Sequence, residues 1–416
     1  MPLLLNAVCL SEGARSNGNR PGQLCDHFRP DDQAGRRRLT GVSASTTSPA
    51  PAASTYQIAV VGGGIAGLAT ALALARAGCA VRVFEARDAP QEAGAGIQLG
   101  PNATLALTAL GVLDAVRPTA AAPDAIAVRR GSSGQTVARM PLGGWIAERH
   151  GSPYLTVLRQ DLHAVLLKAV HTAPRISITY DARITRLGPD ALSFASGHSI
   201  PRPDAVIVAD GLWTALRSAL RAQDAQAAFS GKLAARTLIA TEDAPLVMRT
   251  NDVGTWLSPR GHLVHYPVDA GRRIAVVLVT RGSDPGAGWS RALGSDDATA
   301  ALKQIAPTLD ATCATSATWR SWPLYAREPA YATDDARALL IGDAAHPFVP
   351  FLAQGAAIAL EDAVSLGRAI AHGGDTLDGA LATFAAQRLP RARAVAAAAR
   401  QNGQIFHLGG PAAFAR

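Results

Sequence analysis

A chain of 416 residues is long enough for one large domain with a second lobe and a substantial buried core. Apolar residues make up 48% of it and charged residues 17%, and no run of 18 uncharged apolar residues occurs, so we expect a globular protein without a membrane span. The net charge of +8 comes mostly from scattered arginines without a nucleic-acid-binding pattern, which argues against nucleic-acid binding and favours attraction of small anionic ligands.

Residues 1–55 differ in composition from the rest of the chain. Ser, Thr, Pro, Gly and Arg dominate this segment. It has too little apolar surface to offset the entropy lost on ordering, so we predict a disordered tail. The short apolar run after Met1 has no basic residue before it and does not match a secretory signal.

The cysteines stand far apart in the sequence, at Cys9, Cys25, Cys79 and Cys313, without a C-x-x-C pair. This spacing predicts neither a disulfide framework nor a metal site. We therefore expect no bound metal and a reducing, cytoplasmic location.

Ordered structure is predicted to begin at residues 56–61, an apolar run rich in β-branched side chains that ends in glycines. An Ala/Leu-rich helix is expected over residues 64–77, and Gly78 follows it as a helix-ending signal. Residues 80–85 are typical of a second strand. Together these elements make a βαβ unit of about thirty residues.

The turn inside this unit, Gly62-Gly63-Gly64-Ile65-Ala66-Gly67, satisfies G-x-G-x-x-G directly after a strand and at the start of a helix. The first glycine permits a tight turn, the second lets the backbone approach a pyrophosphate, and the third lets helix and strand pack closely. Glu85 ends the second strand, where a carboxylate accepts hydrogen bonds from ribose hydroxyls and repels a 2′-phosphate. We therefore expect FAD or NAD at Gly62, Gly64, Ala66, Gly67 and Glu85, with a glycine-rich loop of a plain βαβ fold as the alternative.

The remaining elements alternate between helical and strand patterns. They are a helix over 159–170, a strand over 204–209, strands over 263–268 and 273–280, a helical patch near 297–305, a strand over 338–341, and helices over 355–371 and 377–401. This order predicts a nucleotide-binding fold with an insertion. The nucleotide-binding domain would comprise residues 56–121, 154–224 and 331–372, the substrate domain 122–153 and 225–330, and the C-terminal helical segment 373–416.

Residues 342–347, Gly-Asp-Ala-Ala-His-Pro, are followed by Pro-Phe-Leu-Ala-Gln-Gly-Ala at 350–356 and by Glu-Asp-Ala at 361–363. These motifs resemble the flavin-binding signature of the single-component FAD-dependent aromatic hydroxylases, the family of salicylate hydroxylase, 3-hydroxybenzoate 6-hydroxylase and 6-hydroxynicotinate 3-monooxygenase. The resemblance extends from about residue 57 to residue 407. It implies an α/β fold in which a Rossmann-like FAD-binding domain is interrupted by a smaller β-rich substrate domain. It also implies non-covalent FAD, with NADH or NADPH as co-substrate.

The resemblance implies roles for individual side chains around the flavin. Asp343 would accept hydrogen bonds from ribityl hydroxyls, and the helix that starts near Gly355 and Ala356 would direct free amides at the negative charge of the reduced ring. Other positions match family motifs: Gln98 in the loop beside the flavin, Arg159 in an Arg-x-Asp-Leu element, Ile184 as an adenine contact, and Asp210 of an Asp-Gly motif that Arg217 follows. For Asp343, Arg159 and Ile184 the alternatives are a turn residue, a helix cap and a core residue.

In the mechanism that the resemblance implies, NAD(P)H reduces FAD, dioxygen adds at flavin C4a, and the hydroperoxide transfers OH to an electron-rich ring. Such chemistry needs a dry pocket, and Val349, Pro350, Phe351 and Leu352 are expected to form its wall. Some relatives carry a polar residue at the position of Phe351. A substrate contact of theirs is therefore expected to be missing here.

A phenolic substrate also calls for a base or hydrogen-bond acceptor, and residues 261–267 supply His262 and Tyr266. Residues four apart on a strand face the same side, so both would point into one pocket while His265 faces away. Both match polar active-site positions of the family, with a structural histidine as the alternative for His262. We expect His346, which precedes a proline, to shape its loop.

The sequence thus predicts an FAD-dependent monooxygenase that hydroxylates a small aromatic, phenolic or hydroxybenzoate-like substrate with NAD(P)H and O₂. It would act as a monomer or homodimer. Two other functions stay open at this point. One is a flavoprotein reductase or epoxidase of the same fold that acts on a larger apolar substrate, and the other is a protein in which FAD is only structural.

Overall fold

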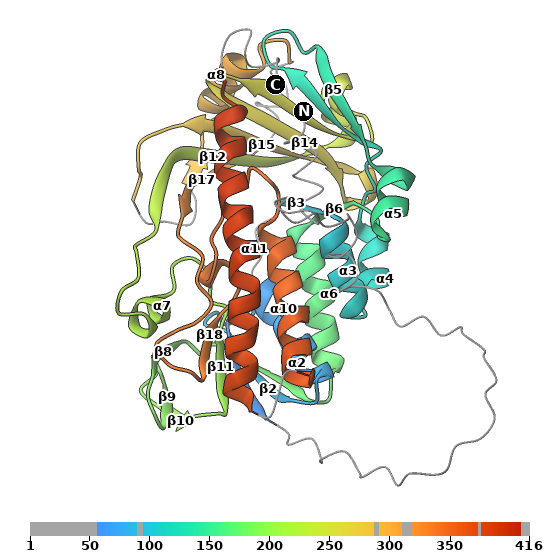
Figure 1. Cartoon of the computed structure of the whole chain (residues 1–416). Helices are drawn as coiled ribbons and strands as arrows, with labels where there is room; N and C mark the ends of the chain where they lie inside the picture. The colour runs from blue at the N-terminus through green and yellow to red at the C-terminus, as the bar shows by residue number, and fades with distance from the viewer. Residues whose placement is uncertain (1–55, 90–94, 287–290, 310–317, 373–375, 409–416) are drawn as a thin grey trace, which may run out of the picture.

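The computed structural model describes residues 56–89, 95–286, 291–309, 318–372 and 376–408 (Figure 1). The predicted disorder of residues 1–55 and three of the cysteines, Cys9, Cys25 and Cys313, lie outside this part of the chain. A parallel sheet with helices occupies the lower half of Figure 1, and a larger sheet occupies the upper half. Helix α11 (Leu377–Ile405) runs alongside both halves.

The lower sheet has five parallel strands in the order β18-β11-β1-β2-β7. These are Ala338–Leu340, Ala205–Val208, Gln57–Val61, Ala80–Phe84 and Ile176–Thr179. Every residue of β11 is buried, as expected of an inner strand in a parallel sheet covered on both faces. A three-stranded antiparallel sheet, β10-β9-β8, packs against the same core and brings Phe194 within 5.3 Å of the ring of Phe84. Its strands are Ser199–Pro201, Ala191–Phe194 and Ile184–Leu187.

Three helices stack beside the parallel sheet: α2 (Ile65–Arg76), α6 (Arg159–Thr172) and α10 (Gly355–His372). Helix α2 lies between the other two, and its small and aliphatic side chains are buried almost all round. A Cβ on Gly367 of α10 would lie 2.8 Å from the carbonyl oxygen of Ala73 in α2. A glycine is therefore required where α10 crosses α2.

The upper sheet has eight strands in the order β16-β17-β12-β15-β14-β13-β4-β5, and all neighbours are antiparallel except β13 and β4. The strands are Arg291–Leu293, Trp319–Ala326, Ala228–Ala240, Arg273–Arg281, Gly261–Val268, Asp252–Ser258, Ala125–Arg130 and Thr136–Pro141. Helix α8 (Ser295–Ile305) covers one face, where Leu302 and Ile305 join a core around Trp256. The other face turns towards the FAD-binding half predicted from the sequence.

A short antiparallel ribbon lies between the two halves (Figure 1). It consists of β3 (Gly96–Leu99) and β6 (Leu155–Leu158). In the chain, α3 (Pro101–Ala109) and α4 (Leu113–Val116) follow β3, and α5 (Gly143–His150) precedes β6. A Cβ on Gly96 would lie 2.6 Å from the Cβ of Ala275 in β15. The ribbon is thus pressed directly onto the upper sheet.

A buried ion network joins α10 to α11. Arg388 pairs with Asp362 at 2.5 Å and with Glu361 at 2.9 Å, and Arg391 also bonds Glu361. These arginines hold the pKa values of both carboxyl groups below their usual range despite the opposing effect of burial. Because removing one partner would leave a buried charge uncompensated, the network fixes the direction of α11.

The predicted fold class is confirmed, and each predicted strand and helix is present close to its expected bounds. The last helix extends to Ile405 rather than ending near residue 401. The upper sheet draws its strands from segments assigned to the substrate domain, while the domain boundaries themselves remain predictions. Among the described residues, no helix is long and apolar enough to cross a bilayer.

Candidate active site

Glycines shape the turn between β1 and α2. Gly62 has a φ of +107°, and a Cβ there would lie 2.5 Å from the carbonyl oxygen of Ala209. A Cβ on Gly67 would lie 1.9 Å from the carbonyl oxygen of Gly62, so strand and helix can approach only with glycine here. A Cβ on Gly64, by contrast, would have nothing described within 4 Å of it. Its bare backbone faces open space at the start of α2, where a pyrophosphate could be held.

Carboxylates follow the strands on either side of β1. Glu85 follows β2 and accepts a hydrogen bond of 2.7 Å from the N–H of Gly63. Asp210 follows β11, and its pKa is raised to about 6, chiefly because surrounding protein removes water from it, with a further contribution from nearby Glu85. Both groups thus stand beside the glycine turn, where ribose hydroxyls could donate to them.

Asp343 lies in a single 3-10 turn, η6 (Gly342–Ala344), which follows β18 at the same edge of the sheet. Gly342 has a φ of +61°, and a Cβ there would lie 2.6 Å from the Cβ of Ala66. The Gly-Asp motif at residues 342–343 therefore packs against the glycine-rich motif at residues 62–67. The Asp343 side chain is exposed and accessible to a ligand.

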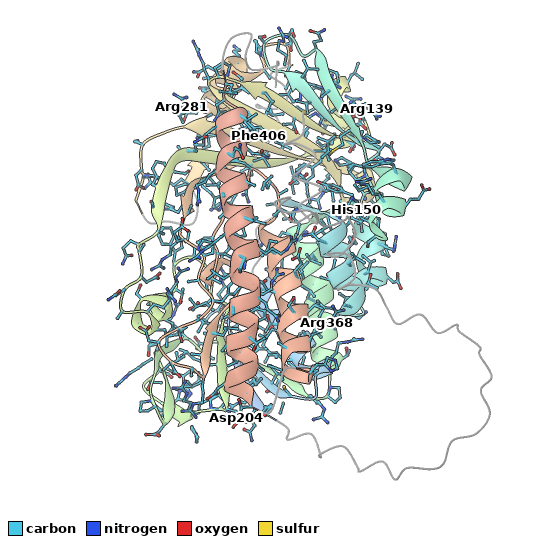
Figure 2. The ribbon with its side chains drawn as sticks, in the orientation of Figure 1. Arg139, His150, Asp204, Arg281, Arg368 and Phe406 are labelled. Atoms are coloured by element: carbon cyan, nitrogen blue, oxygen red, sulfur yellow. The ribbon has the colours of Figure 1, made fainter. Side chains whose placement is uncertain are left out.

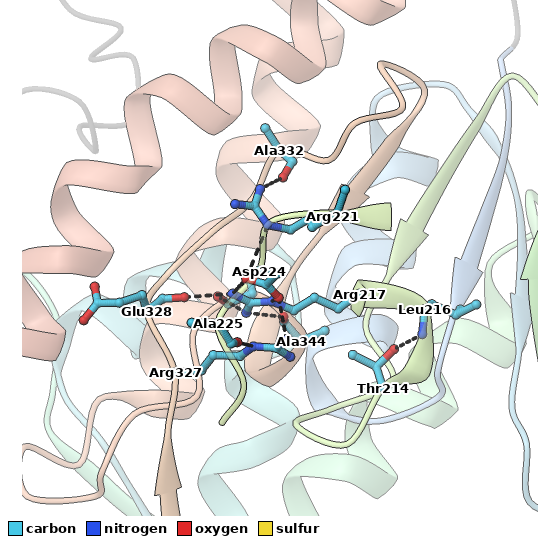
Figure 3. Close-up of polar contacts among 12 residues, drawn as sticks. Thr214, Leu216, Arg217, Arg221, Asp224, Ala225, Arg327, Glu328, Ala332 and Ala344 are labelled. Atoms are coloured by element: carbon cyan, nitrogen blue, oxygen red, sulfur yellow. Dashed lines mark hydrogen bonds and ion pairs between the residues drawn. The ribbon is translucent and has the colours of Figure 1, made fainter. Parts of the chain in front are cut away.

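Arg217 of α7 (Ala215–Leu220) supports the Asp343 turn from within the protein (Figure 3). Its guanidinium is 1% exposed and donates to the carbonyl oxygens of Ala344 at 2.8 Å and Ala345 at 2.9 Å. It also donates twice to Asp224, at 2.7 and 3.0 Å, and once to the carbonyl oxygen of Glu328. All of its donors are therefore used inside the protein, so Arg217 positions the turn rather than meeting a ligand.

Helix α10 begins at Gly355, where a Cβ would meet nothing described within 4 Å. Ala356 follows and is partly exposed. Just before the helix, the side chain of Gln354 accepts a hydrogen bond of 2.9 Å from Asn102 of α3. The start of α10 is thus held in place with free amides that suit an anionic group.

Three other predicted cofactor residues are placed as follows. Arg159 is the first residue of α6, and its N–H donates to the carbonyl oxygen of Ala95 at 2.8 Å. Gln98 of β3 accepts a hydrogen bond from the hydroxyl of Tyr154 and lines the pocket described next. Ile184 is 6% exposed and belongs to the core of the FAD-binding half, which leaves its contact with adenine a prediction.

A pocket lies between the upper sheet and residues 350–354. Apolar side chains of the sheet, including Val253 and Val264, line one side, and Pro350, Phe351 and Leu352 line the other. Val349 is buried behind them in the core. The lining is therefore mostly apolar, as a reaction that must exclude water requires.

His262 and Tyr266 share one face of β14, as their spacing predicts, but of the two only His262 is among the residues that line the pocket. His262 lines the pocket, and burial, with the nearby His407 and Lys232, lowers its pKa to about 3. Tyr266 donates its hydroxyl to the carbonyl oxygen of Gly96 at 2.7 Å, and burial raises its pKa to about 12. At neutral pH His262 is therefore an uncharged acceptor, while Tyr266 is a neutral donor that binds β3.

The other two histidines of interest lie away from the pocket. His265 faces α8, and a Cβ on Gly254 would lie 2.0 Å from its Nε2, so that glycine makes room for the ring. His346 is fully buried, with Nε2 2.7 Å from Asp362 of α10. It ties the loop after η6 to α10.

Sequence reasoning missed three polar residues near the pocket: Tyr154, Arg236 and His407. Arg236 of β12 shares the pocket face of the sheet, and its buried Nε has no hydrogen-bond partner among the described residues. Burial lowers its pKa, while Tyr266 and Asp343 act in the opposite direction. His407 contacts His262 from the turn that follows α11. None of these residues lies in a local motif, and only the long-range packing brings them here.

The phosphate-binding turn, the carboxylates Glu85 and Asp343, and the start of α10 fit one extended FAD molecule. The bare backbone at Gly64 leaves room for its pyrophosphate, and the carboxylates suit its ribose and ribityl hydroxyls. The apolar pocket is lined by His262, whose pKa is lowered to about 3 by burial. A fold and site of this kind define a flavoprotein monooxygenase.

Comparisons with known proteins agree with this class. A family model described as an FAD binding domain matches residues 55–399. The 3-hydroxybenzoate 6-hydroxylase of Klebsiella oxytoca is 34% identical over 355 residues, covering 84% of this chain and 89% of that protein. The 6-hydroxynicotinate 3-monooxygenase of Bordetella bronchiseptica is 34% identical over 320 residues, covering 75% of this chain and 82% of that protein. The crystal structure of Klebsiella pneumoniae HpxO complexed with FAD and uric acid matches with a TM-score of 0.72 at 25% identity, covering 86% of this chain and 90% of that one.

The chain belongs to the FAD binding domain family. Within it, the chain is an FAD-dependent aromatic hydroxylase that uses NAD(P)H, as the resemblance noted in the sequence implied.

Proposed function

We propose that this enzyme hydroxylates a small phenolic ring that carries a carboxylate, with His262 as the base that receives the phenolic proton. The observation that carries the proposal is the buried ring of His262 in the lining of an apolar pocket, where burial lowers its pKa to about 3. The relatives named for 3-hydroxybenzoate and 6-hydroxynicotinate act on small hydroxylated rings of this kind.

In this proposal FAD is held by the turn at Gly62, Gly64, Ala66 and Gly67, by the carboxylates Glu85, Asp210 and Asp343, by Gln98, Arg159 and Ile184, and by the amides at Gly355 and Ala356. When bound, FAD takes electrons from NADH or NADPH and activates dioxygen for transfer to the ring. Pro350 and its neighbours exclude water from that chemistry.

Tyr266 has a positioning role in this proposal. Its hydroxyl donates to Gly96, and its high pKa keeps it protonated, so it does not compete with His262 as a base. It holds β3, and with it Gln98, against the sheet beside the pocket.

Arg236 supports the choice of an anionic substrate. The Arg236 guanidinium lies 5.3 Å from the centroid of the Trp322 ring, and its buried Nε has no hydrogen-bond partner among the described residues, so it would gain from an anionic partner such as a carboxylate. An Arg236→Met variant is expected to raise KM for carboxylated phenols by at least about tenfold. Its KM for the matching phenols without a carboxylate should change little.

The test uses holoenzyme with NADH or NADPH, a panel of hydroxybenzoates and labelled dioxygen. Label is expected in the aromatic product, together with substrate-stimulated oxidation of the nicotinamide. A His262→Asn variant should lose about 100-fold or more in kcat. The matched control, His372→Asn at an exposed position, should keep the wild-type kcat. Nicotinamide oxidation without label in any ring would instead favour a reductase.

We also propose a cytoplasmic location and a monomer or homodimer in solution. Cys79, the only cysteine in the described residues, is buried as a free thiol, which fits a reducing compartment. Light scattering of the holoenzyme would give the oligomeric state, and cell fractionation would give the location.

A further inference from the structure

The end of α11 forms part of the pocket wall, and close contacts fix its position. Asn402 donates to the carbonyl oxygen of Phe351 at 3.2 Å, and a Cβ on Gly403 would lie 2.6 Å from the Phe351 ring. Phe406 lines the pocket, and its ring centroid is 5.1 Å from that of His262 in an edge-to-face arrangement. Figure 2 shows Phe406 at the upper end of α11, beside the upper sheet. The next residue, His407, is therefore placed by packing.

His407 contacts the proposed base directly. Its Nε2 lies 2.9 Å from Nδ1 of His262, and the two rings are tilted by 33°. The rings of Phe351 and Phe406 both meet His262 edge to face, at 5.3 and 5.1 Å, so its orientation is held from two sides. Because Nδ1 and Nε2 of an imidazole point in diverging directions, the contact at Nδ1 leaves Nε2 of His262 for a ligand.

The surroundings keep both rings uncharged. His407 is partly exposed, and burial together with Lys232 of β12 and Arg281 of β15 lowers its pKa to about 4, although a hydrogen bond to the backbone of Gly403 acts in the opposite direction. The pKa of His262 is lowered to about 3 by burial and by the nearby His407 and Lys232. A proton that reaches either ring at neutral pH therefore does not remain there. It has to pass on, and His407 is the member of the pair with access to water.

We propose that His407 receives the proton that His262 takes from the substrate hydroxyl and releases it to solvent. This inference rests on the proposed function, since it needs His262 to act as the base. His407 would thus be a relay residue that touches the base and not the substrate.

The transfer balances with both rings neutral before and after it. The O–H bond of the substrate breaks as an N–H bond forms at Nε2 of His262. The N–H bond at Nδ1 of His262 breaks as one forms at Nε2 of His407, and Nδ1 of His407 gives its proton to water. A phenolate remains in the pocket, and each imidazole has exchanged its tautomer.

The experiment mixes holoenzyme with 3-hydroxybenzoate in a stopped-flow instrument and follows the ultraviolet absorbance of bound phenolate, without NAD(P)H or turnover. His407→Phe keeps an aromatic ring against His262 but has no nitrogen. His407→Gln keeps an amide oxygen that can accept from Nδ1 of His262 but cannot pass a proton on. Both variants are expected to ionise bound phenol at least about tenfold more slowly than wild type. The matched His372→Phe control should equal wild type.

A third variant separates relay from structure. His407→Ala leaves a partly exposed space beside His262. Added imidazole should fill it and restore the rate at which bound phenol is ionised, in proportion to the concentration of neutral imidazole. Wild-type rates in His407→Gln, or no rescue of a folded His407→Ala, would overturn the relay and leave His407 a packing residue. If the phenol binds wild type without being ionised, or His262→Asn ionises it normally, the proposed function fails and the relay fails with it.

Discussion

A Cβ at Gly342 would lie 2.6 Å from the Cβ of Ala66, so the turn after β18 rests directly on the first turn of α2. This one contact sets the separation between Asp343 and the phosphate-binding turn. In the proposed site, two segments far apart in sequence would thereby hold the two ends of a dinucleotide at a fixed spacing.

Replacing Gly342 with Ala should weaken both the fold and FAD binding. The φ of +61° is unfavourable for Ala, and the added methyl group overlaps Ala66, so we expect a loss of about 1–3 kcal/mol in the free energy of unfolding. FAD affinity should fall at least about tenfold, because the Asp343 turn is displaced. Urea unfolding and flavin fluorescence titration measure the two effects. Gly197→Ala is the control, since its φ is +89° but nothing described lies within 4 Å.

Gly64→Ala should behave differently. The apoprotein has room for the methyl group, so unfolding should change by less than about 1 kcal/mol. The methyl group would occupy the space proposed for the pyrophosphate, and FAD binding should be lost. Gly144→Ala, in α5 with equally open surroundings, should bind FAD normally. A Gly64→Ala enzyme with normal flavin affinity would contradict the proposed cofactor position.

Arg217→Ala should destabilise the protein by about 3–5 kcal/mol, because it leaves the buried carboxylate of Asp224 and several carbonyl oxygens with fewer partners. FAD affinity should also fall as the Asp343 turn loosens. Thermal unfolding and flavin titration provide the measurements. The control is Arg221→Ala, which removes a more exposed arginine next to the same carboxylate and should cost less.

Activity should tolerate acid better than an ordinary histidine base would allow. The pKa of His262 is lowered to about 3, so it stays deprotonated, and competent as a base, until the pH approaches that value. We expect kcat/KM to show no titration from this group between about pH 8 and pH 5. A fall in kcat/KM centred near pH 6.5 that disappears in His262→Asn would show that the ring is not in this environment.

His265 should make the protein less stable in acid. Burial lowers its pKa to about 3 from the usual 6.5, so the unfolded state binds a proton more readily than the folded state between these values. The free energy of unfolding therefore falls as the pH drops below about 6.5. His265→Leu should gain up to about 2 kcal/mol relative to wild type between pH 7 and pH 5. Urea unfolding at both pH values checks this, with exposed His171→Leu as the control.

Local pattern was enough to predict where the residues proposed to hold the cofactor lie in the fold. The spacing of Gly62, Gly67 and Glu85 is confined to one βαβ unit, so each residue's place follows from its position in a strand, turn or helix. The two-residue period of a strand likewise predicted that His262 faces the pocket and His265 does not.

The rest of the site depends on contacts that no local pattern encodes. Arg236 shares the pocket face of the sheet only because β12 pairs with β15 in one particular register. His407 reaches it because α11 is long enough, and held firmly enough by Arg388, to end beside β14. For Arg217 the family motif indicated the right neighbourhood, but only the three-dimensional structure shows that its donors all serve the protein.

The pocket takes its walls from segments far apart in the chain, from Gln98 in β3 to Phe406 at the end of α11. A ribosome releases these residues in order, so the cofactor edge can assemble while the catalytic chamber still lacks a side. A nascent or clipped molecule without its final helical turn would therefore have the residues proposed to hold flavin in place next to an open pocket. Ligand binding to the pocket would thus indicate that the last turn of α11 has been synthesised and has packed against the upper sheet.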